Sequence, residues 1–290
     1  MIGRYLTRVV DAQARWAKPF GDFNHRWLSA LFRPIRPVKD FLHGRWLGHP
    51  VHSATTDVPV GALAVALLAE LVGQHQAADL ALIVTLLGMV ASLVTGLADY
   101  SEVDGTARTR ATVHGTVMVV SYALLILSFA LRSGGAPDRT LPAILAIVAF
   151  GTISLGAALG GDLVYLIGTH VNRHAWRGAG AKWIALDLGG LPDIPEGGPT
   201  KLRAGINDLV VIREGERILA VHAQCAHAGG PLAEGARVGD TIECPWHGSR
   251  FRLADGHVVR GPAMYDQPAY EVRRAESGGW EVRRQTAAGS

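Results

Sequence analysis

Four long apolar runs are the feature that most restricts how this chain can fold. They span Asp57–Gly73, Ala77–Ala98, Val113–Leu131 and Leu141–Gly168. A helix crosses a bilayer with about 20 apolar residues, so the second and third runs are long enough and the fourth is longer than needed. The first run is short and carries Glu70 near its end. Helices buried in a soluble bundle would each show a polar stripe. The runs therefore predict an all-α four-helix transmembrane bundle.

Small residues recur at four-residue spacing within two of these runs. The set consists of Gly88, Ser92 and Gly96 in the second run and Gly156 and Gly160 in the fourth. Small side chains on one face let two membrane helices approach closely. This spacing supports packed spans rather than isolated ones.

Basic and aromatic residues alternate ahead of the first run. Nine lysines and arginines precede residue 49: Arg4, Arg8, Arg15, Lys18, Arg26, Arg33, Arg36, Lys39 and Arg45. Such interleaving is typical of helices that lie among lipid headgroups. A nucleic-acid-binding arm is the alternative, and the four spans that follow favour the lipid bilayer as partner and no nucleic acid.

The loops between the runs predict an orientation. The loop at 74–79 has no lysine or arginine and the loop at 132–139 has two. The other side carries the basic N-terminus, Arg108, Arg110 and the basic residues between 173 and 182. Lysine and arginine are enriched in cytoplasmic loops. We therefore expect a multi-pass protein of the inner (plasma) membrane, with both its N-terminus and its C-terminal domain in the cytoplasm.

Both cysteines of the chain lie in two short arms, Cys225-Ala-His227 and Cys244-Pro-Trp-His247. Thiolate and imidazole are the side chains that hold soft and borderline metals. Two of each could bind one tetrahedral zinc ion, or a [2Fe-2S] cluster in which two histidines replace two cysteines on one iron. With both cysteines in the arms, no disulfide framework is expected.

The residues around the arms resemble the Rieske [2Fe-2S] domain over roughly the last hundred positions. The matching segments are His227-Ala-Gly-Gly-Pro231, Cys244-Pro-Trp-His247-Gly-Ser249 and Gly261-Pro262-Ala. The resemblance implies that Cys225 and Cys244 bind one iron and that His227 and His247 bind the other. It also implies that Ser249 donates a hydrogen bond to a cluster sulfide, and that Pro262 belongs to a loop covering the cluster.

Departures from the respiratory members of that family favour the ferredoxin type. Those members carry an extra cysteine beside each arm, joined in a disulfide, where this chain has Gly230 and Trp246. Phe251 stands where a tyrosine would donate a second hydrogen bond. Hydrogen bonds to the sulfurs raise the reduction potential, so a lower potential is expected here. About forty residues follow His247, too few for the iron-containing catalytic domain of a Rieske oxygenase.

The chain is expected to divide into three parts: a basic and aromatic segment at 1–48, the transmembrane domain at 49–178 and the Rieske domain at 179–290. Short β-rich runs at Asp208–Arg213, Arg217–Val221 and Arg250–Leu253 fit an all-β antiparallel sandwich for the last part. The segments Leu42–Gly61 and Gly160–Arg173 resemble the beginning and end of an uncharacterised family of four-helix membrane domains, members of which are fused to Rieske domains.

These features predict a membrane-anchored electron-transfer protein that passes single electrons between a membrane donor or acceptor, a quinone or a haem, and a cytosolic redox partner protein. Two alternatives are a redox- or iron-sensing membrane protein and a ferredoxin that is simply anchored to the membrane. An electron-transfer component is favoured over a terminal oxygenase.

Histidines are expected to gather at one end of the bundle, because the crossings place five of them on the same side. These are His49, His52, His114, His170 and His174, with His75 at the opposite end. They are read either as interfacial residues and helix caps or as ligands. In the second reading His52 and His114, and less directly His170, bind a b-type haem or another metal between the helices.

Overall fold

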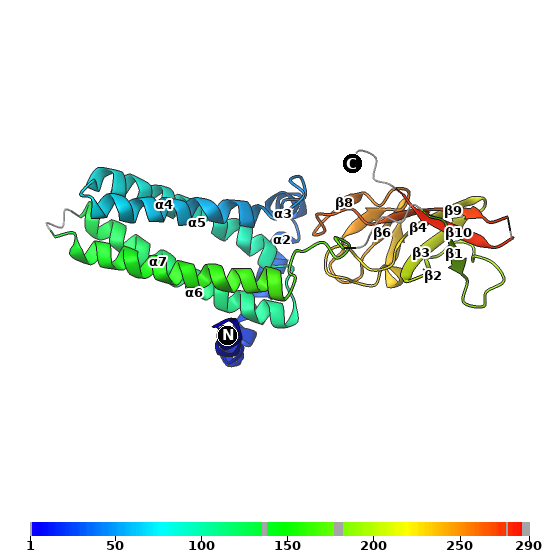
Figure 1. Ribbon diagram of the computed structural model, residues 1–290, viewed down its shortest axis with the longest axis horizontal. Coiled ribbons are helices and arrows are strands. Elements are labelled where there is room, and N and C mark those ends of the chain that lie inside the picture. The colour runs from blue at the N-terminus through cyan, green and yellow to red at the C-terminus, as the bar shows by residue number, and fades with distance from the viewer. Residues whose placement is uncertain (1, 135–137, 177–181, 277, 286–290) are drawn as a thin grey trace. The chain divides into compact units, whose positions relative to one another are not determined.

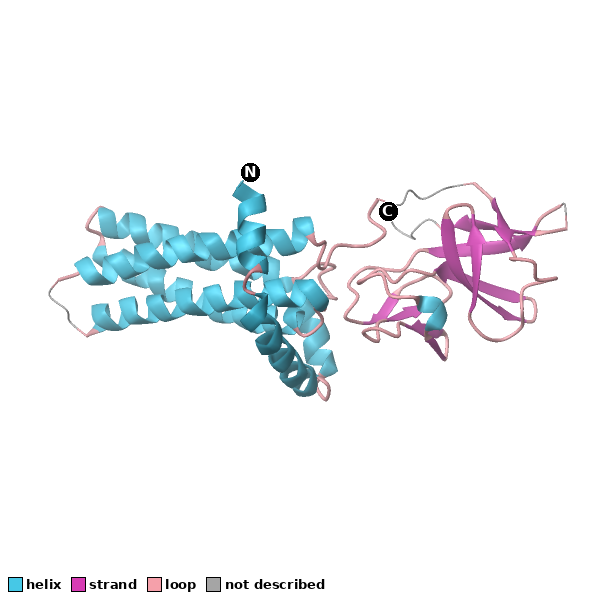
Figure 2. Ribbon diagram, turned by 90° about the horizontal axis from the view of Figure 1, so that it is seen from below, coloured by secondary structure: helices cyan, strands magenta, loops and turns pink. Residues whose placement is uncertain are grey.

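The computed structural model describes residues 2–134, 138–176, 182–276 and 278–285. Two units can be distinguished (Figures 1 and 2). The helical unit contains the chain up to His43 together with Pro50–Thr169, and the β unit contains Gly44–His49 together with the chain from His170 onward. The expected boundary between residues 178 and 179 lies outside the described residues.

Four long helices form the body of the helical unit and lie side by side (Figure 1). They are α4 (Val51–Leu71), α5 (His75–Tyr100), α6 (Gly105–Ser133) and α7 (Thr140–Gly161), and α7 continues as a π-helical turn, η1 (Asp162–Leu166). All four are long and apolar enough to cross a membrane. The predicted all-α four-helix bundle is thereby confirmed.

The helices begin earlier than the apolar runs. In the first turn of α4 the hydroxyls of Ser53 and Thr55 donate to the carbonyls of Pro50 at 2.8 Å and of His52 at 2.9 Å. These bonds satisfy the polar side chains locally, so the helix can start at Val51 although apolar residues begin later. The apolar run by itself therefore does not mark the start of this helix.

Ion pairs with the N-terminal helices account for the early start of α6. Arg108 pairs with Asp22 at 2.9 Å, and Arg110 pairs with Asp11 at 2.9 Å. The two aspartates lie in α2 (Ala14–Phe32) and at the end of α1 (Ile2–Asp11). Arginine side chains on the first turns of α6 thus have fixed acceptors, and the helix extends back to Gly105.

The N-terminal segment forms three helices that pack on one end of the bundle (Figure 1). The third is α3 (Arg36–His43). The hydroxyl of Tyr100 in α5 donates to the carbonyl of Gly21 at 3.2 Å and lies 2.7 Å from the Thr112 hydroxyl. A Cβ at Gly21 would lie 2.5 Å from that same threonine oxygen, so only glycine allows α2 to approach so closely.

An ion-pair network closes the opposite end of the bundle. Glu70 of α4 accepts from Arg132 of α6 and, at 2.7 Å, from Arg139, which directly precedes α7. Asp79 of α5 pairs with the same two arginines, at 3.1 and 2.6 Å. Glu70 is tolerated near the end of an apolar helix because two guanidinium groups neutralise it there.

Antiparallel strands build the β unit in two sheets. Six strands close into a barrel in the order β1-β10-β9-β4-β3-β2, and four form a sheet in the order β5-β6-β7-β8. The barrel strands are β1 (Ile184–Asp187), β2 (Thr200–Ala204), β3 (Asn207–Glu214), β4 (Arg217–His222), β9 (Ala269–Arg274) and β10 (Trp280–Arg284). The small sheet consists of β5 (Ala236–Val238), β6 (Thr241–Glu243), β7 (Arg250–Arg252) and β8 (Val258–Arg260). The predicted all-β antiparallel fold is confirmed, with the larger sheet closed as a barrel.

Barrel and small sheet share a hydrophobic core. Val210 and Ile212 of β3 are fully buried and belong to the same cluster as Ile242 of β6 and Phe251 of β7. Ile242 and Phe251 are also partners across the β6–β7 ladder. This cluster includes both cysteines, so the core holds the two sulfur-bearing loops against the strands that carry them.

Candidate metal centre

Two loops of the β unit carry the Cys/His arms. The first arm, Cys225 to His227, follows the end of β4 at His222. The second, Cys244 to His247, connects β6 to β7, which pair as neighbours in the small sheet. Each arm is thus fixed by a strand immediately ahead of it.

Hydrogen bonds within the first loop aim the sulfur of Cys225. The backbone N–H of Cys225 donates to the carbonyl of Gly230 at 2.8 Å, and its carbonyl accepts from the N–H of Gly229 at 2.9 Å. The thiol sulfur accepts from the backbone N–H groups of His227 and Ala228. Gly229 has φ of +85°, a conformation that side-chain-bearing residues rarely adopt.

The second loop repeats this construction. The N–H of Cys244 donates to the carbonyl of Ser249 at 2.8 Å, and its carbonyl accepts from the N–H of Gly248 at 3.0 Å. The sulfur accepts from the backbone N–H groups of Trp246 and His247. Gly248 has φ of +72°. In both loops the cysteine bonds the fifth residue after it, and a glycine stands fourth.

The two sulfurs meet at the centre of the site. Both cysteines are free of disulfide bonds and almost fully buried. A hydrogen bond from the Cys225 thiol, together with backbone N–H donors, lowers the pKa of Cys244 to about 7. The pKa of Cys225 is raised, because it donates that hydrogen bond and lies buried. The backbone N–H donors of both loops favour negative charge on sulfur, the form in which a cysteine binds a metal ion.

The two imidazoles lie beside each other at a separation that fits one metal ion. The ring centres of His227 and His247 are 5.0 Å apart and their planes are at 89°. A metal–nitrogen bond of about 2 Å plus roughly 1 Å to the ring centre puts two imidazoles on one tetrahedral metal about 5 Å apart. Geometry alone thus fits both the zinc ion and the histidine-ligated iron of a [2Fe-2S] cluster.

Ser249 closely follows the second arm and bonds to Ala263, the residue directly after Pro262. The Ser249 side chain is fully buried, and its oxygen accepts from the backbone N–H of Ala263 at 2.9 Å. Because a hydroxyl can accept and donate at once, its hydrogen remains available for another acceptor. Pro262 is buried directly before Ala263, and Phe251 contributes no hydroxyl.

Gln267 is a site residue that the sequence analysis missed. Its side-chain NH₂ donates to the carbonyls of His222 at 2.7 Å and of Gln224 at 2.6 Å, and its oxygen accepts from the N–H of Ala226 at 2.9 Å. Its side chain is 1% exposed. Three bonds from one amide hold the first loop, and no short motif around Gln267 signals this role.

Two of the histidines expected at the bundle end belong to the β unit. The ring of His170 lies 6.3 Å from that of His227, and its carbonyl accepts from the Tyr265 hydroxyl at 3.0 Å. The Nε2 of His174 donates to the carbonyl of Gln224 at 2.8 Å. The chain leaves the last span after Leu166 and becomes part of the β unit at His170, and of these two residues His174 bonds the residue directly ahead of the first arm.

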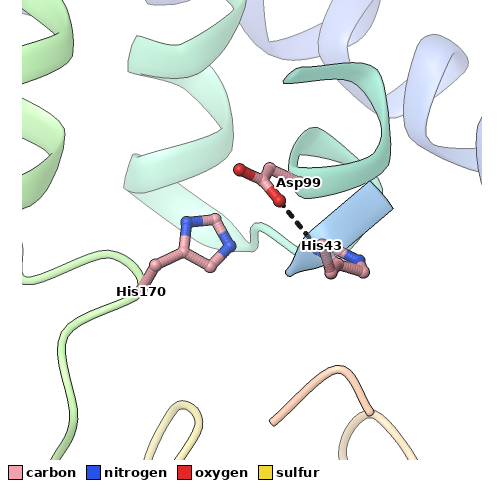
Figure 3. Close-up of side chains that lie close together, drawn as sticks. All are labelled: His43, Asp99 and His170. Carbon is pink, nitrogen blue, oxygen red and sulfur yellow. Dashed lines mark hydrogen bonds and ion pairs between the residues drawn. The ribbon is translucent and has the colours of Figure 1, made fainter. Parts of the chain in front are cut away.

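His52 and His114 remain in the helical unit, where the structure brings them together. Their ring centres are 6.5 Å apart. Another polar pair in the helical unit consists of His43, at the end of α3, and Asp99, near the end of α5. The Nδ1 of His43 donates to the Asp99 carboxylate at 2.7 Å (Figure 3). Both of those side chains are buried.

Comparison with known families decides which group the arms hold. Residues 186–271 match the family model described as Rieske [2Fe-2S] domain. Residues 48–173 match the model described as predicted membrane protein (DUF2231). The cofactor indicated for the β unit is therefore a [2Fe-2S] cluster, and the sequence-based recognition of both parts is confirmed.

Curated relatives include ferredoxins that the chain matches over most of their length. The ferredoxin CarAc of Metapseudomonas resinovorans is 35% identical over 74 residues, which is 26% of this chain and 69% of the relative. The ferredoxin component of the naphthalene 1,2-dioxygenase/salicylate 5-hydroxylase systems of Ralstonia sp is 30% identical over 31% of this chain and 86% of its own length. A cholesterol 7-desaturase of Xenopus laevis is 49% identical over 55 residues, 19% of this chain but only 12% of that protein.

Proposed function

We propose that this chain transfers single electrons between a membrane donor or acceptor and a cytosolic redox partner. The chain belongs to the Rieske [2Fe-2S] family through its β unit and carries a DUF2231 membrane domain ahead of it. The observation that carries this proposal is the convergence of two buried thiols and two imidazoles in two loops of a domain that is similar to ferredoxins. When bound, the cluster accepts and releases one electron at a time.

In this proposal Cys225 and Cys244 bind one iron while His227 and His247 bind the other. The backbone N–H groups that already point at each sulfur stabilise the added negative charge of the reduced state. Ser249 contributes one further donor through its free hydrogen.

A partner protein is proposed to dock over the second arm. Trp246 is 57% exposed and its ring lies 6.4 Å from that of His247, which is itself only partly buried. The first cysteine arm is more deeply enclosed, with His227 7% exposed. Tryptophan is enriched among the residues that contribute most to binding at protein–protein interfaces.

For the membrane side of the pathway we propose a haem or a quinone, in the inner (plasma) membrane, with the N-terminus and the Rieske domain in the cytoplasm. The basic N-terminal region supports this orientation. A mostly apolar cavity of about 310 Å³, lined by Val10, Trp16, Val113 and Leu159 among others, is large enough for part of a quinone.

Paramagnetic resonance of the purified full-length protein tests the site. Reduced wild-type protein should give a Rieske signal, and Cys225→Ser and His247→Ala should each lose it, because each iron needs both protein ligands. The variant His257→Ala, which alters an exposed histidine of the same unit, should keep it. A signal that survives in either ligand variant would contradict the assignment.

The orientation is tested separately by protease treatment of intact cells. We expect the Rieske domain to be cleaved only after the cells are opened. Cleavage from outside would place the domain on the other face of the membrane.

A further inference from the structure

Two histidines lie close together inside the helical unit. His52 lies in the first turn of α4, and His114 lies in α6, in the other helix hairpin. Their ring centres are 6.5 Å apart and the ring planes are at 83°. Both side chains are partly buried. The pair therefore sits where two hairpins, α4–α5 and α6–α7, meet.

A helix carbonyl fixes the tautomer of each ring. The Nδ1 of His52 bonds the carbonyl of Ser92 in α5 at 2.9 Å, and the Nδ1 of His114 bonds the carbonyl of Gly156 in α7 at 2.8 Å. A carbonyl can only accept, so each Nδ1 carries the hydrogen. In a neutral imidazole the lone pair is then on Nε2. Metal-binding histidines are held in the same way, with the other ring nitrogen bonded to a backbone carbonyl.

Each ring also packs on a glycine one turn beyond that carbonyl. A Cβ at Gly96 would lie 2.9 Å from Cε1 of His52, and a Cβ at Gly160 would lie 3.4 Å from Cε1 of His114. Gly96 follows Ser92 by four residues, and Gly160 follows Gly156 by four. Each hairpin thus holds its histidine in the same way: one residue accepts a hydrogen bond from the ring through its carbonyl, and a glycine four residues later packs against the ring. We call this glycine contact the ring seat.

The separation of the ring centres matches the distance that two imidazoles have when both bind one metal ion. A direct N–H···N hydrogen bond of about 3 Å, with roughly 1 Å from each nitrogen to its ring centre, would put the centres about 5 Å apart. Two imidazoles on opposite sides of one metal, each bonded at about 2 Å, would put them about 6 Å apart. The observed 6.5 Å fits the second arrangement. By contrast, the 5.0 Å between His227 and His247 fits two ligands on adjacent positions of one metal.

A metal bound by this pair needs further ligands that come from a cofactor. Among the described residues, no third histidine, cysteine, aspartate or glutamate joins His52 and His114 in a group of ligand atoms within 4.8 Å. Zinc and similar ions need about four ligands. A porphyrin supplies four nitrogens in a plane and leaves two opposite positions for axial imidazoles, as in haem bound between helices of a bundle.

We propose that His52 and His114 are the axial ligands of a b-type haem in the membrane domain. This inference deepens the proposed electron-transfer function and rests on it for its role, since it identifies the membrane redox group. The haem iron accepts one electron on going from ferric to ferrous. His170 is not a ligand in this proposal, because it belongs to the β unit.

The test uses full-length protein in detergent, titrated with haem b. Wild-type protein should bind one haem per chain and show a Soret band, whose position shifts when dithionite supplies one electron per iron. His52→Asn and His114→Asn should each lose this band. An asparagine amide can replace the Nδ1–H that bonds the helix carbonyl, while it removes Nε2, so the helix contact is retained and only the ligand is lost.

His75→Ala is the matched histidine control, because His75 is half-exposed at the start of α5, beside Glu70. It should bind haem as the wild type does. A second pair of variants tests the ring seat. Gly96→Ala should weaken haem binding by about tenfold or more, since it displaces His52. Gly151→Ala, whose added Cβ meets nothing within 4 Å, should leave binding unchanged.

Two results would overturn the proposal. One is wild-type protein that binds no haem, or that retains a non-haem metal in place of haem. The other is a Soret band that persists in both asparagine variants. The Rieske paramagnetic signal, recorded on the same samples, distinguishes failure of the haem proposal from failure of the proposed electron-transfer function. Wild-type protein that binds no haem but keeps the Rieske signal refutes the haem site alone.

Discussion

Replacing Gln267 by leucine tests whether one buried amide holds the first metal-binding loop. The change removes three hydrogen bonds of 2.6 to 2.9 Å from a side chain that is 1% exposed. The N–H of Ala226, itself fully buried, loses its acceptor. An orphaned buried donor costs about 1–3 kcal/mol, and each of the two other bonds contributes about 0.5–1.5 kcal/mol. We expect a loss of about 3 kcal/mol, after allowing for the apolar area that leucine buries.

The assay is thermal bleaching of the cluster absorbance in full-length protein. For a domain of roughly 100 residues, 1 kcal/mol shifts the midpoint by about 4 °C or more, so the variant should bleach roughly 12 °C below the wild type. Heating rates must match, because cluster loss is irreversible. The low-temperature paramagnetic signal should keep its shape, since Gln267 is not a ligand.

Gln285→Leu is the matched control for this change. The side chain of Gln285 makes one exposed hydrogen bond, 3.0 Å to the carbonyl of Ala254. Its replacement should alter stability by about 0.5 kcal/mol or less. The reasoning is refuted if Gln267→Leu bleaches within about 2 °C of wild type, or no earlier than this control.

Three further outcomes are expected from the β unit. Ser249→Ala should lower the reduction potential by roughly 40 mV, because a lost donor of about 1 kcal/mol no longer stabilises the reduced cluster, and a redox titration that shows no decrease would contradict this. The variant also removes the acceptor of the Ala263 N–H, so it should bleach earlier than wild type. The reduction potential of the cluster should fall by about 60 mV per pH unit once the histidine ligands of the oxidised state begin to deprotonate, because the oxidised state loses its protons first. A reduction potential that stays constant into the alkaline range would argue against imidazole ligation. Bonds from Trp280 and Arg213 lower the pKa of Asp193 in the folded state, so its contribution to stability is full above about pH 4 and is lost as the pH falls below that value. Acid unfolding of Asp193→Asn should lack this part of the pH dependence, and an unchanged acid transition would exclude Asp193 as its source.

The metal-binding loops could be predicted because their geometry is local. In each loop the cysteine bonds the fifth residue after it, a glycine with positive φ stands fourth, and the N–H donors to sulfur lie two and three residues on. Spacing within six residues therefore carries nearly all the information about each arm. The four spans were predictable for a similar reason, since length and apolar composition alone decide whether a helix can cross a bilayer.

Helix ends and supporting residues could not be predicted, because their partners are distant in sequence. The start of α6 depends on Asp11 and Asp22, far back in the N-terminal helices. Gln267 holds the N–H of Ala226 across 41 positions. No local pattern distinguishes such a glutamine from a solvent-exposed one, since its role arises only when the barrel brings the end of β4 beside the segment before β9.

The membrane histidines show which features follow from the sequence and which follow only from the tertiary structure. The sequence by itself determined that His52 and His114 lie at the same end of the bundle, through the count of crossings, and that small residues recur every fourth position. Only the tertiary structure decided that the two ring centres lie 6.5 Å apart, with each ring bonded to a carbonyl 40 or 42 residues away and packed on a glycine of its own hairpin. The physical reason is that crossing number fixes the depth of a residue in the membrane, whereas the direction of its side chain is fixed by the helices packed around it.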